Sequence, residues 1–173
     1  QAQIQELVDK NQFDGAIAKA QAFYKEHRPE EKALDSLHLS IELLEKQKKY
    51  RPAAEHSETL AKELKDLKKN SEADKVSQHA VQLFLQLGDL LRAQESLKLS
   101  TELALEESKR KENLELSAEI SSWYGKVDDV EAAWKLLDPY LNKEEKATLK
   151  TRQFSYYEAN APDKAKQIKQ SFI

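Results

Sequence analysis

The residue types that most often carry enzyme chemistry occur in this chain, but their spacing does not assemble a catalytic or metal site. The 173 residues include no cysteine, and no histidine stands at metal-ligand spacing from another histidine or an acid. Neighbouring acids such as Glu144 and Glu145 diverge by about 100° on a helix, so they do not face one substrate. We therefore expect a protein that is not an enzyme and that needs no metal or cofactor. The four histidines are interpreted as surface residues: His27, His38, His56 and His79.

One spacing does suggest a binding surface. Glu112, Glu115 and Glu119 follow at steps of three and four residues, and Trp123 continues the row four residues later. All four would share one face of a helix. Carboxylates attract a cationic partner, and an indole can accept a cation or bury an apolar side chain. The row predicts a site for a basic or neutral-polar peptide with an apolar anchor. The alternative is a solvated acidic face, with Trp123 packed in the core between two hairpins.

The elements that must position this row are amphipathic helices joined by short turns. Three glycines and four prolines are too few for an all-β protein, and apolar residues recur at helical steps, as along residues 34–44. In the central turn Gly88 can end one helix in the left-handed conformation and Asp89 can cap the next. Related turns occur at 11–16, 48–53, 125–130 and 160–165. These signals predict an all-α fold of five helical hairpins, over residues 1–28, 29–69, 71–109, 111–139 and 142–173.

Some helix ends are predicted from other local signals. Pro29 suits the first turn of a helix, and Ser71 with Asp74 and Asn142 with Glu145 have the spacing of N-terminal caps. No glycine or proline lies between residues 90 and 124, although a hairpin is required there. We place that break at 109–112, where the apolar face lapses.

Composition excludes several classes of protein. The net charge is −3 at pH 7 with acids and bases interspersed, so nucleic acid is an unsuitable partner. No apolar run approaches the ~20 residues of a membrane-spanning helix, so we expect no direct membrane insertion. The absence of cysteine fits a cytoplasmic or a bacterial periplasmic location equally well. The chain contains no Met, so we expect a processed protein or a domain of a larger one.

The turns also carry a resemblance to a known family. Their equivalent positions, Phe13, Tyr50, Leu90, Val127 and Pro162, are separated by 37, 40, 37 and 35 residues, close to the ~34-residue period of tetratricopeptide repeats. Over essentially its whole length the chain resembles a divergent member of that family. The turn pattern matches best at Gly88, Leu90 and Ala93. The fourth copy has Val130 where Ala is usual, and most of the family's first-helix Trp, Gly and Tyr residues are replaced.

The resemblance implies a fold and a class of function. The expected fold is one domain, 1–173, a right-handed superhelical solenoid of about five antiparallel hairpins, present as a monomer or weak homo-oligomer. The implied function is a non-enzymatic protein-protein interaction scaffold that holds a peptide or helix in its concave groove. The alternative is a sensory or regulatory module of a larger signalling protein. Matching the copies places these residues in the groove: Asp35, His38, Glu42, Gln78, Gln82, Glu112, Glu115, Glu119, Trp123, Phe154 and Tyr157.

Overall fold

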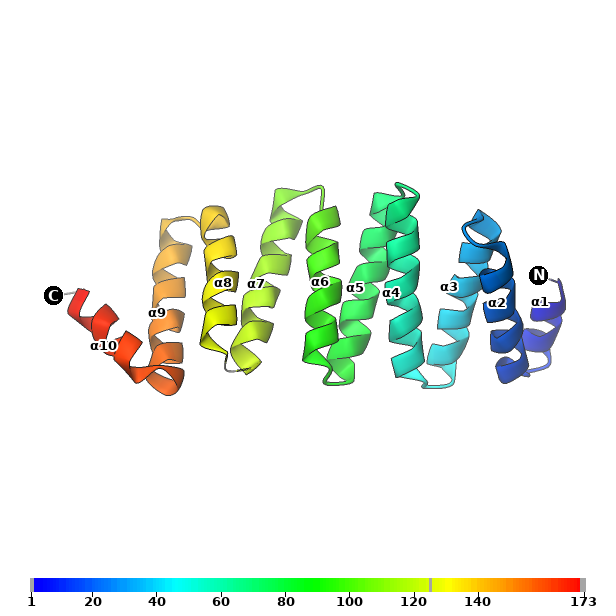
Figure 1. The fold of residues 1–173 in the computed structure, drawn as a ribbon, viewed down its shortest axis with the longest axis horizontal. Coiled ribbons are helices and arrows are strands. Elements are labelled where there is room, and N and C mark those ends of the chain that lie inside the picture. The colour runs from blue at the N-terminus through cyan, green and yellow to red at the C-terminus, as the bar shows by residue number, and fades with distance from the viewer. Residues whose placement is uncertain (1, 125, 172–173) are drawn as a thin grey trace. The chain divides into compact units, whose positions relative to one another are not determined.

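The protein is all-α. The computed structural model describes residues 2–124 and 126–171, and within these ranges the chain forms ten α-helices and one short 3-10 helix, with no strand (Figure 1). The all-α part of the predicted fold class is therefore confirmed. None of the helices in the described ranges has the length and apolar character needed to cross a membrane. The predicted turn at Gly125, and the last two residues of the fifth hairpin, Phe172 and Ile173, lie outside the described residues.

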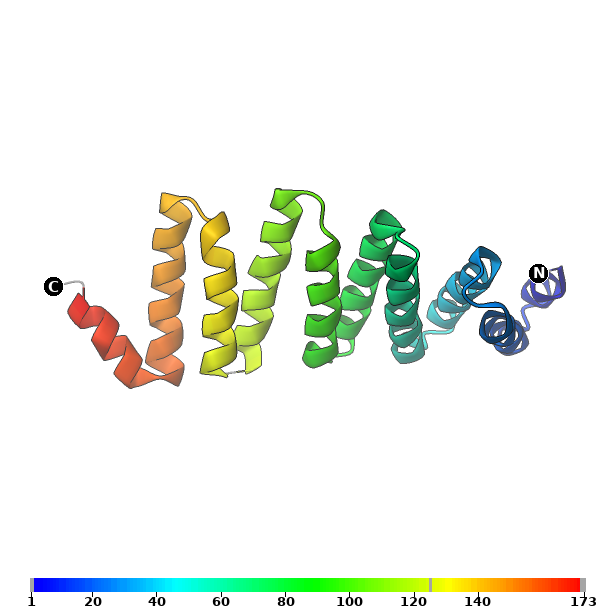
Figure 2. The ribbon, with the colours of Figure 1, turned by 45° about the horizontal axis from the view of Figure 1, so that its top comes forward.

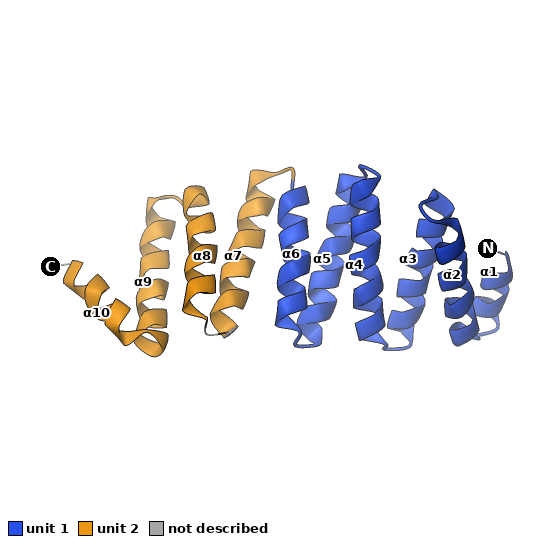
Figure 3. Ribbon diagram, viewed as in Figure 1, with its two compact units in different colours: residues 1–104 blue, residues 105–173 orange. Residues whose placement is uncertain are grey.

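The contacts divide the chain into two compact units where the sequence predicted one domain. Unit 1 covers residues 1–104 and unit 2 covers residues 105–173 (Figure 3). Each unit has a hydrophobic core of its own.

Unit 1 consists of six helices, each packed on the next along the chain. Successive helices run antiparallel, as both views of the ribbon show (Figures 1 and 2). Leu37, Leu43 and Phe84 are among its most deeply buried side chains, and fully buried alanines such as Ala53 and Ala93 let the helix axes approach closely. The helices are α1 (Ala2–Asp9), α2 (Phe13–His27), α3 (Glu31–Lys46), α4 (Tyr50–Asp66), α5 (Asn70–Gln86) and α6 (Leu90–Leu103).

Four turns of unit 1 share one backbone geometry although their residues differ. Asn11, Lys48, Lys68 and Gly88 adopt φ values of 55°, 58°, 63° and 69°. At the last of these the Asp89 amide donates to the Phe84 carbonyl at 2.9 Å, which closes the helix end in a Schellman arrangement. Equivalent bonds of 2.8–2.9 Å close the other three turns. The same hydrogen bond therefore closes three turns in which a non-glycine residue adopts the left-handed conformation.

Three predicted helix ends are corrected by the structure. The break expected at 109–112 lies earlier: α6 ends at Leu103, Ala104 is extended, and α7 already begins at Glu107. Ser71 does not cap α5, which starts one residue earlier at Asn70 and has no side-chain cap. Pro29 lies outside α3, which starts at Glu31.

Unit 2 consists of four α-helices and the 3-10 helix. Its core joins Ala118, Val130, Trp134, Tyr157 and Ala165, so all four α-helices contribute to it. The predicted cap before α9 is confirmed. The Asn142 side chain accepts from the Glu144 and Glu145 amides at 3.0 and 2.9 Å, and the Glu145 carboxylate accepts from the Asn142 amide. The elements are α7 (Glu107–Tyr124), α8 (Val127–Leu137), η1 (Asp138–Tyr140), α9 (Lys143–Asn160) and α10 (Pro162–Ser171).

Candidate functional site

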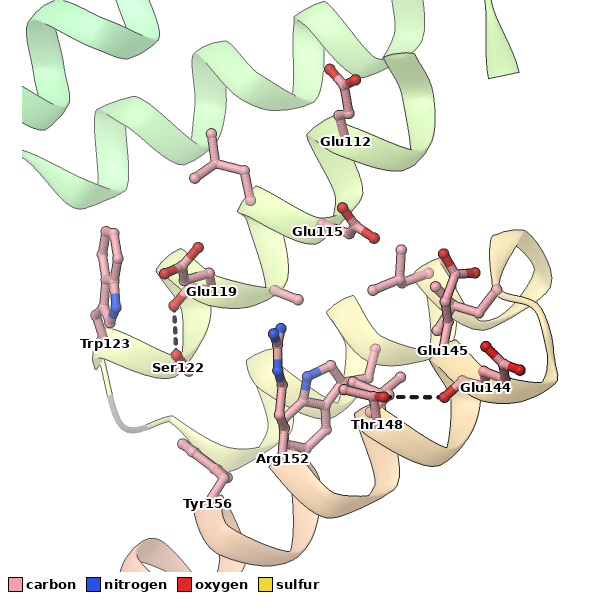
Figure 4. A pocket seen from close by; sticks show the side chains of 16 residues that line it. Glu112, Glu115, Glu119, Ser122, Trp123, Glu144, Glu145, Thr148, Arg152 and Tyr156 are labelled. Atoms are coloured by element: carbon pink, nitrogen blue, oxygen red, sulfur yellow. Dashed lines mark hydrogen bonds between the residues drawn. The ribbon is translucent and has the colours of Figure 1, made fainter. Parts of the chain in front are cut away.

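The predicted acidic row lines a cavity of about 900 Å³ that lies wholly within unit 2. Helices α7 and α9 form its two walls, and α8 with the segment after it forms its floor (Figure 4). We call it the acidic cavity. Its lining residues are Glu112, Glu115, Leu116, Ala118, Glu119, Ser122, Trp123, Trp134, Leu137, Leu141, Glu144, Glu145, Thr148, Leu149, Arg152 and Tyr156.

The α7 wall carries the row that the sequence predicted. Leu114, Ala118 and Ile120 are buried, and this leaves the three glutamates of the row exposed on the same helix. Trp123 is 51% exposed at the end of the row. The structure thus places this indole at a cavity wall rather than in the core.

The α9 wall begins with the capping box. Glu145 forms a salt bridge with Lys111 of α7, so this ion pair joins the two walls at one end. The bond from Lys111, together with the bond from the Asn142 amide, lowers the pKa of the Glu145 carboxyl. Further along α9, Thr148 and Arg152 face the cavity, and Figure 4 shows the Arg152 side chain reaching from α9 toward α7.

The floor is aromatic. Trp134 is 7% exposed and meets the Tyr156 ring edge-on, with 5.5 Å between ring centroids. The Tyr156 hydroxyl is buried without a hydrogen-bond partner among the described residues. Burial also raises the pKa of Tyr156, which keeps its hydroxyl neutral. The floor therefore combines a large apolar surface with one neutral hydroxyl that has no hydrogen-bond partner within the described part of the chain.

The charges of the acidic cavity are strongly unequal. Five glutamates line it, against the single guanidinium of Arg152. Glu112 is 3.4 Å from Lys109 and Glu145 is paired with Lys111, but within residues 2–124 and 126–171 the Glu115, Glu119 and Glu144 carboxylates form no salt bridge. Arg152 likewise forms none there. A cation entering the cavity would therefore meet three carboxylates that form no salt bridge within the part of the chain that the structure describes.

Two of the residues predicted for this surface lie elsewhere, which corrects the predicted register of α9. Tyr157 is 7% exposed, lies in the core and donates its hydroxyl to Glu131 at 2.7 Å. Phe154 lines a different cavity, between α9 and α10. Packing of Tyr157 on Trp134, with 5.8 Å between ring centroids, rotates α9 so that Arg152 and Tyr156 face the acidic cavity instead.

The other predicted groove residues belong to unit 1. Asp35, His38 and Glu42 are exposed on α3, with 3.5 Å between the His38 ring and the Glu42 carboxylate. On α5, Gln82 is exposed, whereas Gln78 is half-buried and donates to Asp74 at 3.0 Å. The structure thus brings together the predicted residues of α7 and leaves those of α3 and α5 in a separate unit.

The α9 wall was missed, although the sequence holds a signal for it. Glu145, Thr148, Arg152 and Tyr156 follow at steps of three, four and four residues, the same steps as Glu112, Glu115, Glu119 and Trp123. The two rows are offset by 33 residues, which is close to one repeat period. Superimposing the chain on itself at that offset pairs acid with acid at one end and aromatic with aromatic at the other.

The acidic cavity presents carboxylates, aromatic rings and hydroxyls, which can form ion pairs, cation–π contacts and hydrogen bonds with a bound molecule. Within the part of the chain that the structure describes, no three His, Asp or Glu side chains are grouped so that they could hold a metal ion. Comparison with protein-family models, with curated proteins and with solved structures found no match to this chain.

Proposed function

We propose that this protein is a divergent tetratricopeptide-like helical repeat scaffold whose acidic cavity binds a basic peptide segment with an apolar anchor. The observation that carries the proposal is the cavity itself, in which carboxylates without salt bridges surround an aromatic floor.

The repeat plan is supported by interactions between alternate helices. Glu45 of α3 meets His79 of α5 at 2.9 Å, a separation of 34 residues. Lys111 of α7 meets Glu145 of α9, again 34 residues apart. Lys164 of α10 meets Glu131 of α8 at 2.6 Å, 33 residues apart. Contacts one repeat apart between equivalent helices are expected when helical hairpins stack in register.

The partner's chemistry follows from the cavity walls. Glu115 and Glu119 would attract Lys or Arg side chains, mainly by speeding association at low salt. Trp123, together with Trp134 and Tyr156 of the floor, would bury an apolar side chain of the same segment. A half-exposed aromatic wall next to a buried aromatic floor is typical of the anchor positions that dominate peptide affinity.

A fluorescein-labelled pentapeptide, Arg-Lys-Leu-Arg-Lys with blocked ends, tests the proposal by fluorescence anisotropy. Changing Glu115→Gln and Glu119→Gln together should weaken binding about tenfold at low salt and less at high salt. Trp123→Ala should cost ~2 kcal/mol of binding free energy, about 30-fold in Kd, since it removes the exposed anchor wall.

Glu107→Gln with Glu158→Gln is the matched control. Both glutamates are exposed in unit 2, neither lines the acidic cavity, and the pair removes the same net charge. If the control weakens binding as much as the cavity pair, the attraction is a property of net charge alone. If neither the cavity pair nor Trp123→Ala affects binding, the acidic cavity is not the binding site.

A further inference from the structure

A second cavity of about 950 Å³ in unit 2 is lined by α9, by the segment before it and by α10. Helix α10 diverges from α9 (Figures 1 and 2). Lysines dominate the charge of this second cavity, in contrast to the acidic cavity. Lys143, Lys146 and Lys150 line it from α9, and Lys169 lines it from α10. We call it the lysine cavity.

Most of this positive charge is not neutralised by the protein. Asp138 is the one acid in the lining, and it already forms a salt bridge with Lys146 at 3.1 Å. Across residues 2–124 and 126–171, Lys143, Lys150 and Lys169 form no salt bridge. Among the residues that the structure describes, three ammonium groups therefore border the cavity without a salt-bridge partner.

Between these lysines the lining is apolar. Leu141, Leu149 and Phe154 are half-buried and contribute to it, as does Ala147. Leu141 and Leu149 also line the acidic cavity, so these two leucines form the wall between two cavities of opposite charge. An occupant that complements the lysine cavity must carry negative charge on either side of an apolar group.

We propose that the lysine cavity binds an acidic peptide segment that carries a bulky apolar side chain. Lys143 and Lys150 are seven residues apart, which spans about 10 Å along the helix axis. Carboxylates spaced along an extended peptide can meet both ends of this row while a central leucine contacts Ala147, which lies between the two lysines on the same helix face. A single anionic headgroup concentrates its charge at one point and matches the row less well. This second peptide site is distinct from the site of the proposed function and has the opposite charge preference.

The probe is a fluorescein-labelled hexapeptide, Glu-Glu-Leu-Leu-Glu-Glu with blocked ends, measured by anisotropy against the whole chain. The variant Lys143→Glu/Lys150→Glu replaces the attraction between these two lysines and the peptide carboxylates by repulsion. It should weaken hexapeptide binding about tenfold. Lys135→Glu/Lys166→Glu is the matched control, because it makes the same charge change at exposed positions of unit 2 outside the lysine cavity. Circular dichroism of each variant checks that the helices are retained.

Three results would overturn the proposal. The first is unchanged hexapeptide binding in Lys143→Glu/Lys150→Glu, and the second is an equal loss in the control pair. The third is binding to vesicles of phosphatidylserine and phosphatidylcholine that depends on these lysines, with no binding of the hexapeptide, which would identify a membrane surface as the occupant. The basic pentapeptide is measured on the same variants. Its binding should persist in Lys143→Glu/Lys150→Glu, so failure of one site is distinguishable from failure of the other.

Discussion

Removing the hydroxyl group from each of two adjacent tyrosines in α9 should have different effects on the stability of unit 2. Tyr157 donates to Glu131 at 2.7 Å, and Glu131 also accepts a bond from Lys164, so the Glu131 carboxylate of α8 links α9 and α10. The Tyr156 hydroxyl is buried with no hydrogen-bond partner among the described residues. Tyr157→Phe should therefore destabilise unit 2, whereas Tyr156→Phe should leave it unchanged or stabilise it.

The magnitude follows from the surroundings of each hydroxyl. A hydrogen bond to a charged group contributes about 1.5–3 kcal/mol. The Glu131 side chain is 34% exposed, so water can replace part of the lost bond, and we expect the lower limit, about 1.5 kcal/mol, for Tyr157→Phe. Removing a buried hydroxyl without a partner relieves a desolvation cost, so Tyr156→Phe should change the free energy of unfolding by between 0 and about 1 kcal/mol in the stabilising direction.

Urea unfolding followed by tryptophan fluorescence measures both effects. The chain has two tryptophans, so a Trp123→Phe background leaves Trp134, which contacts both tyrosine rings, as the only indole. The two single variants are compared with this background through the midpoint and the slope of the transition.

The reasoning would be refuted by equal destabilisation in both variants, or by a larger loss in Tyr156→Phe. Either outcome would mean that the Tyr156 hydroxyl forms a hydrogen bond at least as strong as that of the Tyr157 hydroxyl. The register of α9, and with it the position of Arg152 in the acidic cavity, would then need revision.

Two further predictions concern acid stability and turn geometry. Hydrogen bonds from Lys164 and from Tyr157 lower the pKa of Glu131 below 4.5, so its contribution is present above pH 4.5 and is lost as pH falls through the lower folded-state pKa. On acidification the free energy of unfolding of the wild type should therefore fall by about 0.5 kcal/mol more than that of Glu131→Gln. Urea unfolding at several pH values measures this, and parallel dependence of the two unfolding free energies on pH would contradict it. In unit 1, Lys68→Gly should stabilise by about 0.5–1 kcal/mol, because φ at this exposed residue is 63°. Gly88→Ala should lower the free energy of unfolding by about 1 kcal/mol, because alanine is strained at a φ of 69°. This loss comes from the backbone alone, since an added Cβ would meet no atom within 4 Å. Thermal unfolding by circular dichroism compares the two, and a loss of stability in Lys68→Gly would contradict the turn geometry.

Features that depend on a few neighbouring residues could be predicted from the sequence. Gly88 ends a helix with φ at 69°, and Asp89 caps the next through the Arg92 amide at 3.3 Å. The capping box at Asn142 was also predictable, since its bonds span three residues. The α7 row lies on one face because steps of three and four residues return to the same side of any α-helix.

Features that depend on contacts between helices were decided only by the tertiary structure. Nothing in residues 104–106 breaks a helix by propensity, yet the chain is extended at Ala104, next to a leucine, Leu105, that is 83% exposed. The α9 register follows from Tyr157 packing on Trp134, a contact between residues of two different helices. That rotation places Arg152 opposite the α7 glutamates and Phe154 in the lysine cavity. The sequence alone determined which residues share a helix face, whereas which faces meet across a cavity depended on how side chains far apart in the chain fill a common core.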